Sequence, residues 1–237
     1  MIDAHDSEHP MGDATVPRDH AASFEASFRQ FVNAPEFPCL AGKGVVRRSD
    51  YGFGVFGALG TEQAAVALAS SLGRFVRALP CDGSELRAFA AVFPDREPTS
   101  EIAFERRLWR QLQLLHEHDE LGAEWDPSAS ADPESAQFSF SFAGRALFVV
   151  GLHPRSSRLS RRFHWPSLVF NPRAQFERLR AEGKFERLRD AVRERDVALQ
   201  GTPNPNLADF GERSEARQYS GRSTEPKWRC PFHRRDP

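Results

Sequence analysis

The sequence predicts a single α+β domain in which a mixed or antiparallel β-sheet packs against four or five helices. Phe138, Phe140 and Phe142 alternate with polar residues just before the apolar run ALFVVGL, a pattern typical of a β-hairpin. Residues 101–121 carry an amphipathic stripe, which predicts a helix. The chain has 237 residues, 40% of them hydrophobic, and no change of composition divides it into two cores.

The N-terminal segment is polar and lacks apolar periodicity, so residues 1–22 are predicted to form a disordered tail. The folded domain is expected to span residues 23–237. Its first element is a helix from Ser23 to Phe31, because three phenylalanines recur there at helical spacing and two prolines follow.

The next elements are predicted to be a hairpin and a helix. The segment FPCLAGKGVV leads into a strand, and residues 44–56 have apolar residues on both sides of a turn near Ser49 and Gly52. Thr61 occupies an N-cap position, and the helix that it begins is expected to end before Pro80.

The middle of the chain predicts a strand, a long helix, a loop and a second hairpin. Residues 84–93 begin like a helix but end in FAAVF, which is typical of a buried strand. Ser100 caps the helix over residues 101–121, and the polar stretch 122–134 predicts a loop. Residues 137–152 form the second hairpin.

The C-terminal part predicts a strand, two helices and an irregular tail. SLVFN after Pro166 indicates a strand, and residues 171–201 indicate two helical stretches broken near Gly183. Residues 202–237 are rich in polar residues yet contain four large aromatic side chains, which a linker does not need. We expect this tail to fold back over the body, and a ligand beneath it is one alternative.

Charge and motifs exclude several classes of function. The net charge is −1, so neither nucleic acid nor an anionic membrane is an expected partner. Three cysteines without a CxxC pair favour neither a disulfide scaffold nor a zinc site. The apolar run 146–152 is too short to span a bilayer and no secretion signal is recognisable, so a soluble cytoplasmic protein is expected. No nicotinamide, nucleotide or hydrolase motif occurs.

His153 is the first candidate site residue, because it ends the most apolar strand and precedes an arginine-rich loop. Imidazole can ligate iron, and guanidinium groups pair with carboxylates. Haem needs an axial ligand, an apolar pocket and cations for its propionates, so this combination fits haem. The alternative is a turn histidine followed by a solvated basic loop. The candidate cations are Arg158, Arg161 and Arg162.

Cys39 and the segment GERSEARQYSGR are the other candidates. Cys39 has three interpretations: a thiolate ligand of iron, a nucleophile, or a buried apolar residue. The segment GERSEARQYSGR contains Glu215 and Tyr219 among several other polar groups. It is either a polar lid over an amino-acid-like substrate or a structural hydrogen-bond knot.

Ordered motifs along the chain resemble those of the YqcI/YcgG family. They are FPCLAGKG, LHPRSSRLSRRF, LVFNPRAQFERLR, RERDVALQGTPNP, DFGERSEARQYSGR and WRCPF. The resemblance implies a haem-dependent N-oxygenase that hydroxylates a guanidine or amine nitrogen of arginine, an arginine-derived compound or a lysine-like substrate, in a bacterial natural-product pathway. The chain departs from the family at Arg173, where a histidine commonly follows the FNP element, and arginine cannot replace histidine as an iron ligand.

The resemblance also implies the cofactor and its ligand. It favours haem b with His153 as the axial ligand of the iron, and Cys39 stays the alternative. Dioxygen would be the co-substrate, and an external reductant, supplied through a separate electron-transfer partner, is required because the chain has no flavin or nicotinamide motif.

The remaining assignments follow from this reading. Arg158, Arg161 and Arg162 would contact propionates or a substrate carboxylate. Glu215 would receive a cationic substrate head, and Tyr219 joins it as a candidate catalytic residue. Two other functions stay open, a non-catalytic haem-binding or haem-sensing protein and a haem-free interaction protein.

Overall fold

The computed structural model describes residues 18–80, 82–94, 97–119, 124–206 and 212–234. Its sheet has five strands in the order β1-β2-β5-β4-β3, with β1 and β2 parallel and the other neighbours antiparallel. This arrangement confirms the predicted α+β class with a mixed sheet. The strands are β1 (Tyr51–Val55), β2 (Ala88–Val92), β3 (Phe140–Phe142), β4 (Arg145–Leu152) and β5 (Ser167–Pro172).

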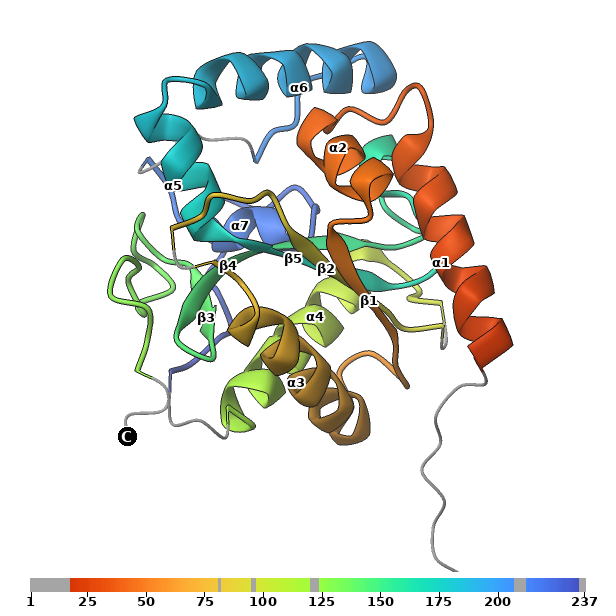
Figure 1. Ribbon diagram of the computed structural model, residues 1–237, viewed down its shortest axis with the longest axis vertical. Coiled ribbons are helices and arrows are strands. Elements are labelled where there is room, and N and C mark those ends of the chain that lie inside the picture. Colours follow the sequence, from red (N-terminus) through yellow and green to blue (C-terminus); the bar gives the residue numbers. More distant parts are fainter. Residues whose placement is uncertain (1–17, 81, 95–96, 120–123, 207–211, 235–237) are drawn as a thin grey trace, which may run out of the picture.

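Helices cover both faces of the sheet. Figure 1 shows α3 and α4 on one side of the sheet and α6 on the other, with α1, α2 and α5 beside α6. The α-helices of the described residues are α1 (Arg18–Asn33), α2 (Leu40–Arg48), α3 (Glu62–Arg77), α4 (Glu101–Glu117), α5 (Arg173–Ala181), α6 (Phe185–Gln200) and α7 (Ala216–Tyr219). A short 3₁₀ helix spans Leu159–Arg161.

The second predicted hairpin is confirmed. Phe140 pairs with Leu147 in antiparallel register, and the turn between the strands consists of Ala143 and Gly144. Both turn residues have positive φ, 51° and 73°, as a two-residue hairpin turn requires.

The first predicted hairpin is wrong. Residues that were expected to form its first arm belong to α2, and Ser49 ends that helix in the left-handed conformation with φ 59°. Val45 and Val46 are both buried on α2, so packing outweighs the weak helix propensity of this glycine- and valine-rich segment. The second arm is β1, which pairs in parallel with β2.

The other predicted elements lie close to their expected positions. Helices α3 and α4 begin after the Thr61 and Ser100 caps, and α5 and α6 are separated near Gly183. Helix α1 begins at Arg18, within the segment predicted to be a disordered tail; residues 1–17 lie outside the described residues. In the described part of the chain, no helix is long and apolar enough to cross a membrane.

The C-terminal tail is ordered against the face covered by α4, as predicted. Tyr219 and Phe232 are fully buried there, and Trp228 packs against the same core. The fourth aromatic residue of the tail, Phe210, lies outside the described residues. The tail therefore completes the core on this side of the sheet.

Candidate functional site

A cavity of about 270 Å³ lies between the sheet and the helices on the α6 side. Its floor is the face of β2, β4 and β5 that carries Ala90, Val150 and Val169, and Val192 of α6 contributes to its roof. Most of the lining is apolar, with residues of α1 and α2 on the flank. Such a lining suits a largely apolar ligand held by a few polar contacts.

Cys39 lines this cavity and is the N-cap residue of α2. Its Sγ accepts a hydrogen bond from the backbone N–H of Gly42 at 3.3 Å. Burial raises the pKa of the thiol, while the N–H groups of Gly42 and Ala41 and the charge of Arg161 act in the opposite direction. Burial is the largest of these effects, so the pKa of Cys39 is raised overall, and the helix N-terminus and the cation offset it only in part.

Arg161 also lines the cavity. Its guanidinium donates to three backbone carbonyls, those of Gly151 at 3.1 Å, Gln218 at 3.3 Å and Tyr219 at 3.4 Å. Burial lowers the pKa of Arg161 to about 10, against the opposing effects of Asp196 and Cys39. Among the described residues, no carboxylate lies within ion-pair distance of this guanidinium, so the cavity contains a cation without a directly paired anion.

The other two candidate arginines are used elsewhere. Arg158 is buried, forms an ion pair with Asp196 of α6 and donates to the carbonyl of Thr202 at 3.0 Å. Arg162 is exposed, and its Nε donates to the carbonyl of Ser156 at 2.9 Å. Of the three, Arg161 alone is among the residues that line the apolar cavity.

His153 lies in the core on the α4 side and is not among the residues that line the cavity. Its ring stacks on Phe104 of α4 with centroids 4.1 Å apart, and the side chain is fully buried. Neither ring nitrogen has a hydrogen-bond partner among the residues that the structure describes. Burial, with a smaller contribution from Arg161, lowers the pKa of His153 to about 4, so the imidazole is neutral at physiological pH.

Glu215 and Tyr219 form a buried cluster with Ser139 next to the β3–β4 hairpin. The Tyr219 hydroxyl donates to Glu215 Oε1 at 2.5 Å and accepts from the backbone N–H of Phe140 at 3.0 Å, and Ser139 Oγ donates to the same carboxylate oxygen at 2.6 Å. Burial raises the pKa of Glu215 to about 7. Neither Glu215 nor Tyr219 is among the residues that line the apolar cavity, and their contacts hold α7 against the hairpin.

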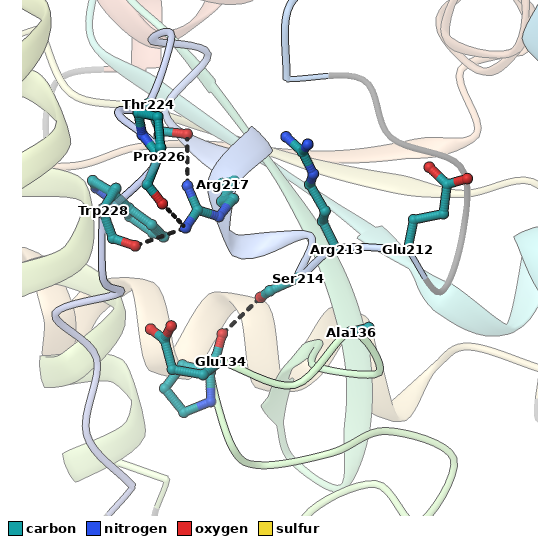
Figure 2. A pocket seen from close by; sticks show the side chains of 10 residues that line it. Glu134, Ala136, Glu212, Arg213, Ser214, Arg217, Thr224, Pro226 and Trp228 are labelled. Atoms are coloured by element: carbon teal, nitrogen blue, oxygen red, sulfur yellow. Dashed lines mark hydrogen bonds between the residues drawn. The ribbon is translucent and has the colours of Figure 1, made fainter.

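The rest of the segment GERSEARQYSGR forms a network of structural hydrogen bonds beside a second, open pocket of about 460 Å³ (Figure 2). Arg217 donates to the carbonyls of Glu225 and Trp228 at 3.1 Å and 2.7 Å, and Ser214 Oγ donates to the carbonyl of Pro133 at 2.7 Å. These contacts correspond to the structural knot, the second of the two interpretations of this segment.

Asp196, Asn171 and Gln175 are among the polar residues of the cavity that were not predicted from the sequence. Asn171 stands at the end of an apolar strand within the FNP element, which is the one signal that the sequence offers for it. The neighbouring Arg173 is buried outside the cavity lining and donates to Glu177 Oε1 at 3.0 Å and to the carbonyl of Gln137 at 3.1 Å.

Comparison with known proteins relates the chain to two bacterial proteins of undetermined function. The model of the YqcI/YcgG family matches residues 28–233. The uncharacterized protein YcgG of Bacillus subtilis (strain 168) is 28% identical over 210 residues, which cover 84% of this chain and 82% of that protein. The uncharacterized protein YqcI of the same organism is 32% identical over 135 residues, covering 54% of this chain and 52% of that protein. No solved structure matches the chain significantly.

Proposed function

The chain belongs to the YqcI/YcgG family, and we propose that it is a haem-dependent N-hydroxylase acting on a guanidine or amine nitrogen of a small amino-acid-like substrate. The observation that carries the proposal is the presence of a thiol and a half-buried guanidinium, Cys39 and Arg161, in one apolar cavity. Bacterial natural-product biosynthesis is the setting that the family resemblance suggests.

The residues of the cavity fit the chemistry of haem. A macrocycle needs apolar walls, which the sheet face and α1–α2 provide, and a soft or imidazole ligand for iron. The Cys39 sulfur supplies the ligand atom, and Arg161 supplies a cation beside it. Bound haem would supply an iron centre that activates dioxygen, with electrons from a separate reductant.

The geometry favours Cys39 over His153 as the axial ligand. Cys39 faces the cavity from a helix N-terminus, whereas His153 stacks on Phe104 on the other side of the sheet. A thiolate at Cys39 would be stabilised by the Gly42 N–H and by the positive charge of Arg161, which has no carboxylate partner of its own.

The chain's own residues would then perform three tasks. The apolar floor excludes water from the reacting nitrogen and strengthens electrostatic interactions in the cavity. Arg161 balances the thiolate charge. Asp196 forms an ion pair with Arg158 and accepts from Ser160 Oγ at 2.9 Å, and these contacts hold the roof helix over the cavity until they break.

Room for a macrocycle must come from α6. A void of about 270 Å³ lies just below the usual size range of ligand pockets, and Asp196 is the one buried residue of α6. Gly183 and Gly201 flank the helix with φ of 64° and 79°, and both have open space around them. We infer that α6 lifts about these glycines to admit the cofactor.

Turnover tests the proposed function. Protein reconstituted with hemin, together with a reductant and dioxygen, is incubated with arginine, lysine and agmatine, and mass spectrometry detects addition of one oxygen atom to a nitrogen. We expect product from the wild type and from Cys230→Ser, the matched control at a buried cysteine outside the apolar cavity. Cys39→Ser should lose it.

Two outcomes would contradict the proposal. Haem binding without any hydroxylated product would favour a haem-binding or haem-sensing protein. Protein that takes up no hemin at all would favour a haem-free interaction protein.

A further inference from the structure

Two amide side chains interrupt the apolar wall of the cavity at the end near α5. Asn171 is the last residue of β5 that lines the cavity. Gln175 lies in the first turn of α5 and is 4% exposed. An amide group in an apolar wall costs free energy unless its donors and acceptors are used. Each of the two amides is only partly satisfied within the protein.

The orientation of Gln175 is fixed by a backbone group. Its Oε1 accepts a hydrogen bond from the N–H of Arg87 at 2.8 Å. Only an oxygen can accept this bond, so Nε2 is the atom left over, and it has no hydrogen-bond partner among the described residues. Gln175 therefore offers a donor to whatever occupies the cavity.

The orientation of Asn171 is fixed in the opposite sense. Its Nδ2 donates to the carbonyls of Phe148 and Val169, each at 3.2 Å. Only a nitrogen can donate to a carbonyl, so Oδ1 is the atom left over, again without a partner among the described residues. Asn171 therefore offers an acceptor.

A neutral donor and a neutral acceptor in the lining of one cavity match a ligand group with both a hydrogen-bond acceptor and a donor and no net charge. The α-carboxylate and α-ammonium of a free amino acid form such a group. We propose that Asn171 and Gln175 bind the α-amino-acid end of the substrate, with Gln175 Nε2 donating to the carboxylate and Asn171 Oδ1 accepting from the ammonium.

The arrangement of the helices places this subsite away from the thiol. Helix α6 runs from α5 towards the segment before α2, where Arg195 Nη2 donates to the carbonyl of Phe37 at 3.2 Å (Figure 1). Cys39 follows that segment directly, whereas Gln175 belongs to α5. An amino acid anchored at α5 would extend its side-chain nitrogen along the apolar floor towards Cys39. This inference rests on the proposed function for the choice of substrate, but its binding test needs no haem.

Calorimetric titration with three related probes tests the subsite in haem-free and hemin-loaded protein. The probes are L-arginine, agmatine, which lacks the carboxylate, and 5-guanidinopentanoate, which lacks the amino group. We expect the wild type to bind arginine at least about tenfold more tightly than either analogue, the effect of one hydrogen bond to a charged group. L-Lysine and cadaverine form the corresponding pair for an amine substrate.

Two variants separate the roles of the amides. Gln175→Glu keeps the acceptor for the Arg87 N–H but removes the free donor, so it should weaken arginine binding about tenfold or more and leave agmatine binding undiminished. Asn171→Leu should abolish the preference for arginine over 5-guanidinopentanoate. Gln218→Glu, which places a carboxylate elsewhere in the cavity lining, is the matched control and should retain the preference for arginine over agmatine.

The outcomes distinguish this subsite from the proposed function. Equal binding of arginine and agmatine, and of lysine and cadaverine, by the wild type would overturn the subsite, as would the absence of amino-acid binding. Preference for amino acids that depends on Asn171 and Gln175, in a protein that takes up no hemin, would uphold the subsite while the proposed haem chemistry fails.

Discussion

The two faces of the sheet use their buried polar residues in different ways. On the α4 side, Glu105 pairs with Arg222, and Glu215 bonds to Tyr219, so both buried carboxyl groups have partners. On the α6 side, Arg161 has no carboxylate partner within ion-pair distance in the described part of the chain, and the amides of Asn171 and Gln175 each leave one atom without a partner.

This difference distinguishes buried polar groups that stabilise the fold from buried polar groups that are available to bind a ligand. Buried polar groups that are fully paired specify and stabilise a fold, whereas unpaired ones are costly and require another explanation. On the α4 side, His153 is an ionisable group whose two ring nitrogens are buried and have no partner in the described part of the chain, and the side-chain nitrogens of Trp109 and Gln111 on α4 are also buried and unpartnered.

Removing Glu105, the partner of the buried Arg222, should lower the free energy of unfolding more than any other substitution considered below. Arg222 donates to Glu105 Oε2 through Nε at 3.0 Å and Nη2 at 2.7 Å. Glu105→Ala would leave a buried guanidinium with only the exposed Glu225 as counter-ion, so we expect the free energy of unfolding to fall by about 3–5 kcal/mol. Urea denaturation measures this.

Arg161→Gln, on the cavity side, is the comparison variant, and it should lower the free energy of unfolding by only about 1 kcal/mol. An equal loss of stability in the two variants would contradict the difference between the two faces of the sheet.

His153 should make the protein sensitive to acid. Because its pKa is about 4 in the folded chain and 6.5 when unfolded, its contribution to stability is complete above pH 6.5 and is lost as the pH falls towards 4. The loss is about 3 kcal/mol. His153→Leu should flatten this part of the stability profile, followed by denaturation at several pH values. A wild-type profile without this dependence would indicate that the imidazole has a partner in solution.

Glu215 should act in the opposite direction. Its pKa is raised by burial from 4.5 to about 7, so its contribution to stability is complete below pH 4.5 and is lost as the pH rises through 7. We expect an effect of about 3 kcal/mol, similar to that of His153, because the two pKa values are displaced by similar amounts. Thermal unfolding of Glu215→Gln from pH 5 to 8 measures it, since the amide cannot ionise. If the variant and the wild type show the same slope, the carboxyl group is not buried as described.

Neighbouring alanines on β2 provide the mildest test. Ala91 packs in the core with α3 and α4, whereas Ala90 lines the cavity. Ala91→Val should destabilise the protein by about 1–3 kcal/mol through overpacking, and Ala90→Val should cost less than about 1 kcal/mol because its methyl groups can enter the void. Chemical denaturation of the two variants gives the comparison. A larger cost at Ala90 would mean that the cavity is closed in solution.

The elements that could be predicted from the sequence were those with strong local signals. The Thr61 and Ser100 caps, and the alternation from Phe138 to Phe142, define α3, α4 and the β3–β4 hairpin without reference to the rest of the chain. Helix α2 was missed because its valines and glycines favour other structures locally, and only packing makes the segment helical.

The site was harder to predict because the side of the sheet on which each residue lies decides which residues share the cavity, and the sequence does not give this. Cys39 and Arg161 were both candidates, but no pattern indicated that they share a cavity or that Arg158 is held by Asp196. His153 was a candidate because it follows an apolar strand, but the alternation of side chains along that strand places it on the α4 side of the sheet. Asn171 and Gln175 have ordinary sequence contexts, and their unpaired atoms become evident only in three dimensions.

The absorption spectrum of the carbon monoxide complex of the reduced, hemin-loaded protein tests the central claim, that the cavity on the α6 side binds haem through Cys39. We predict a thiolate-type Soret band in the wild type and in His153→Leu, and its loss in Cys39→Ser. A histidine-type spectrum in the wild type that Cys39→Ser leaves unchanged and His153→Leu abolishes would contradict the account.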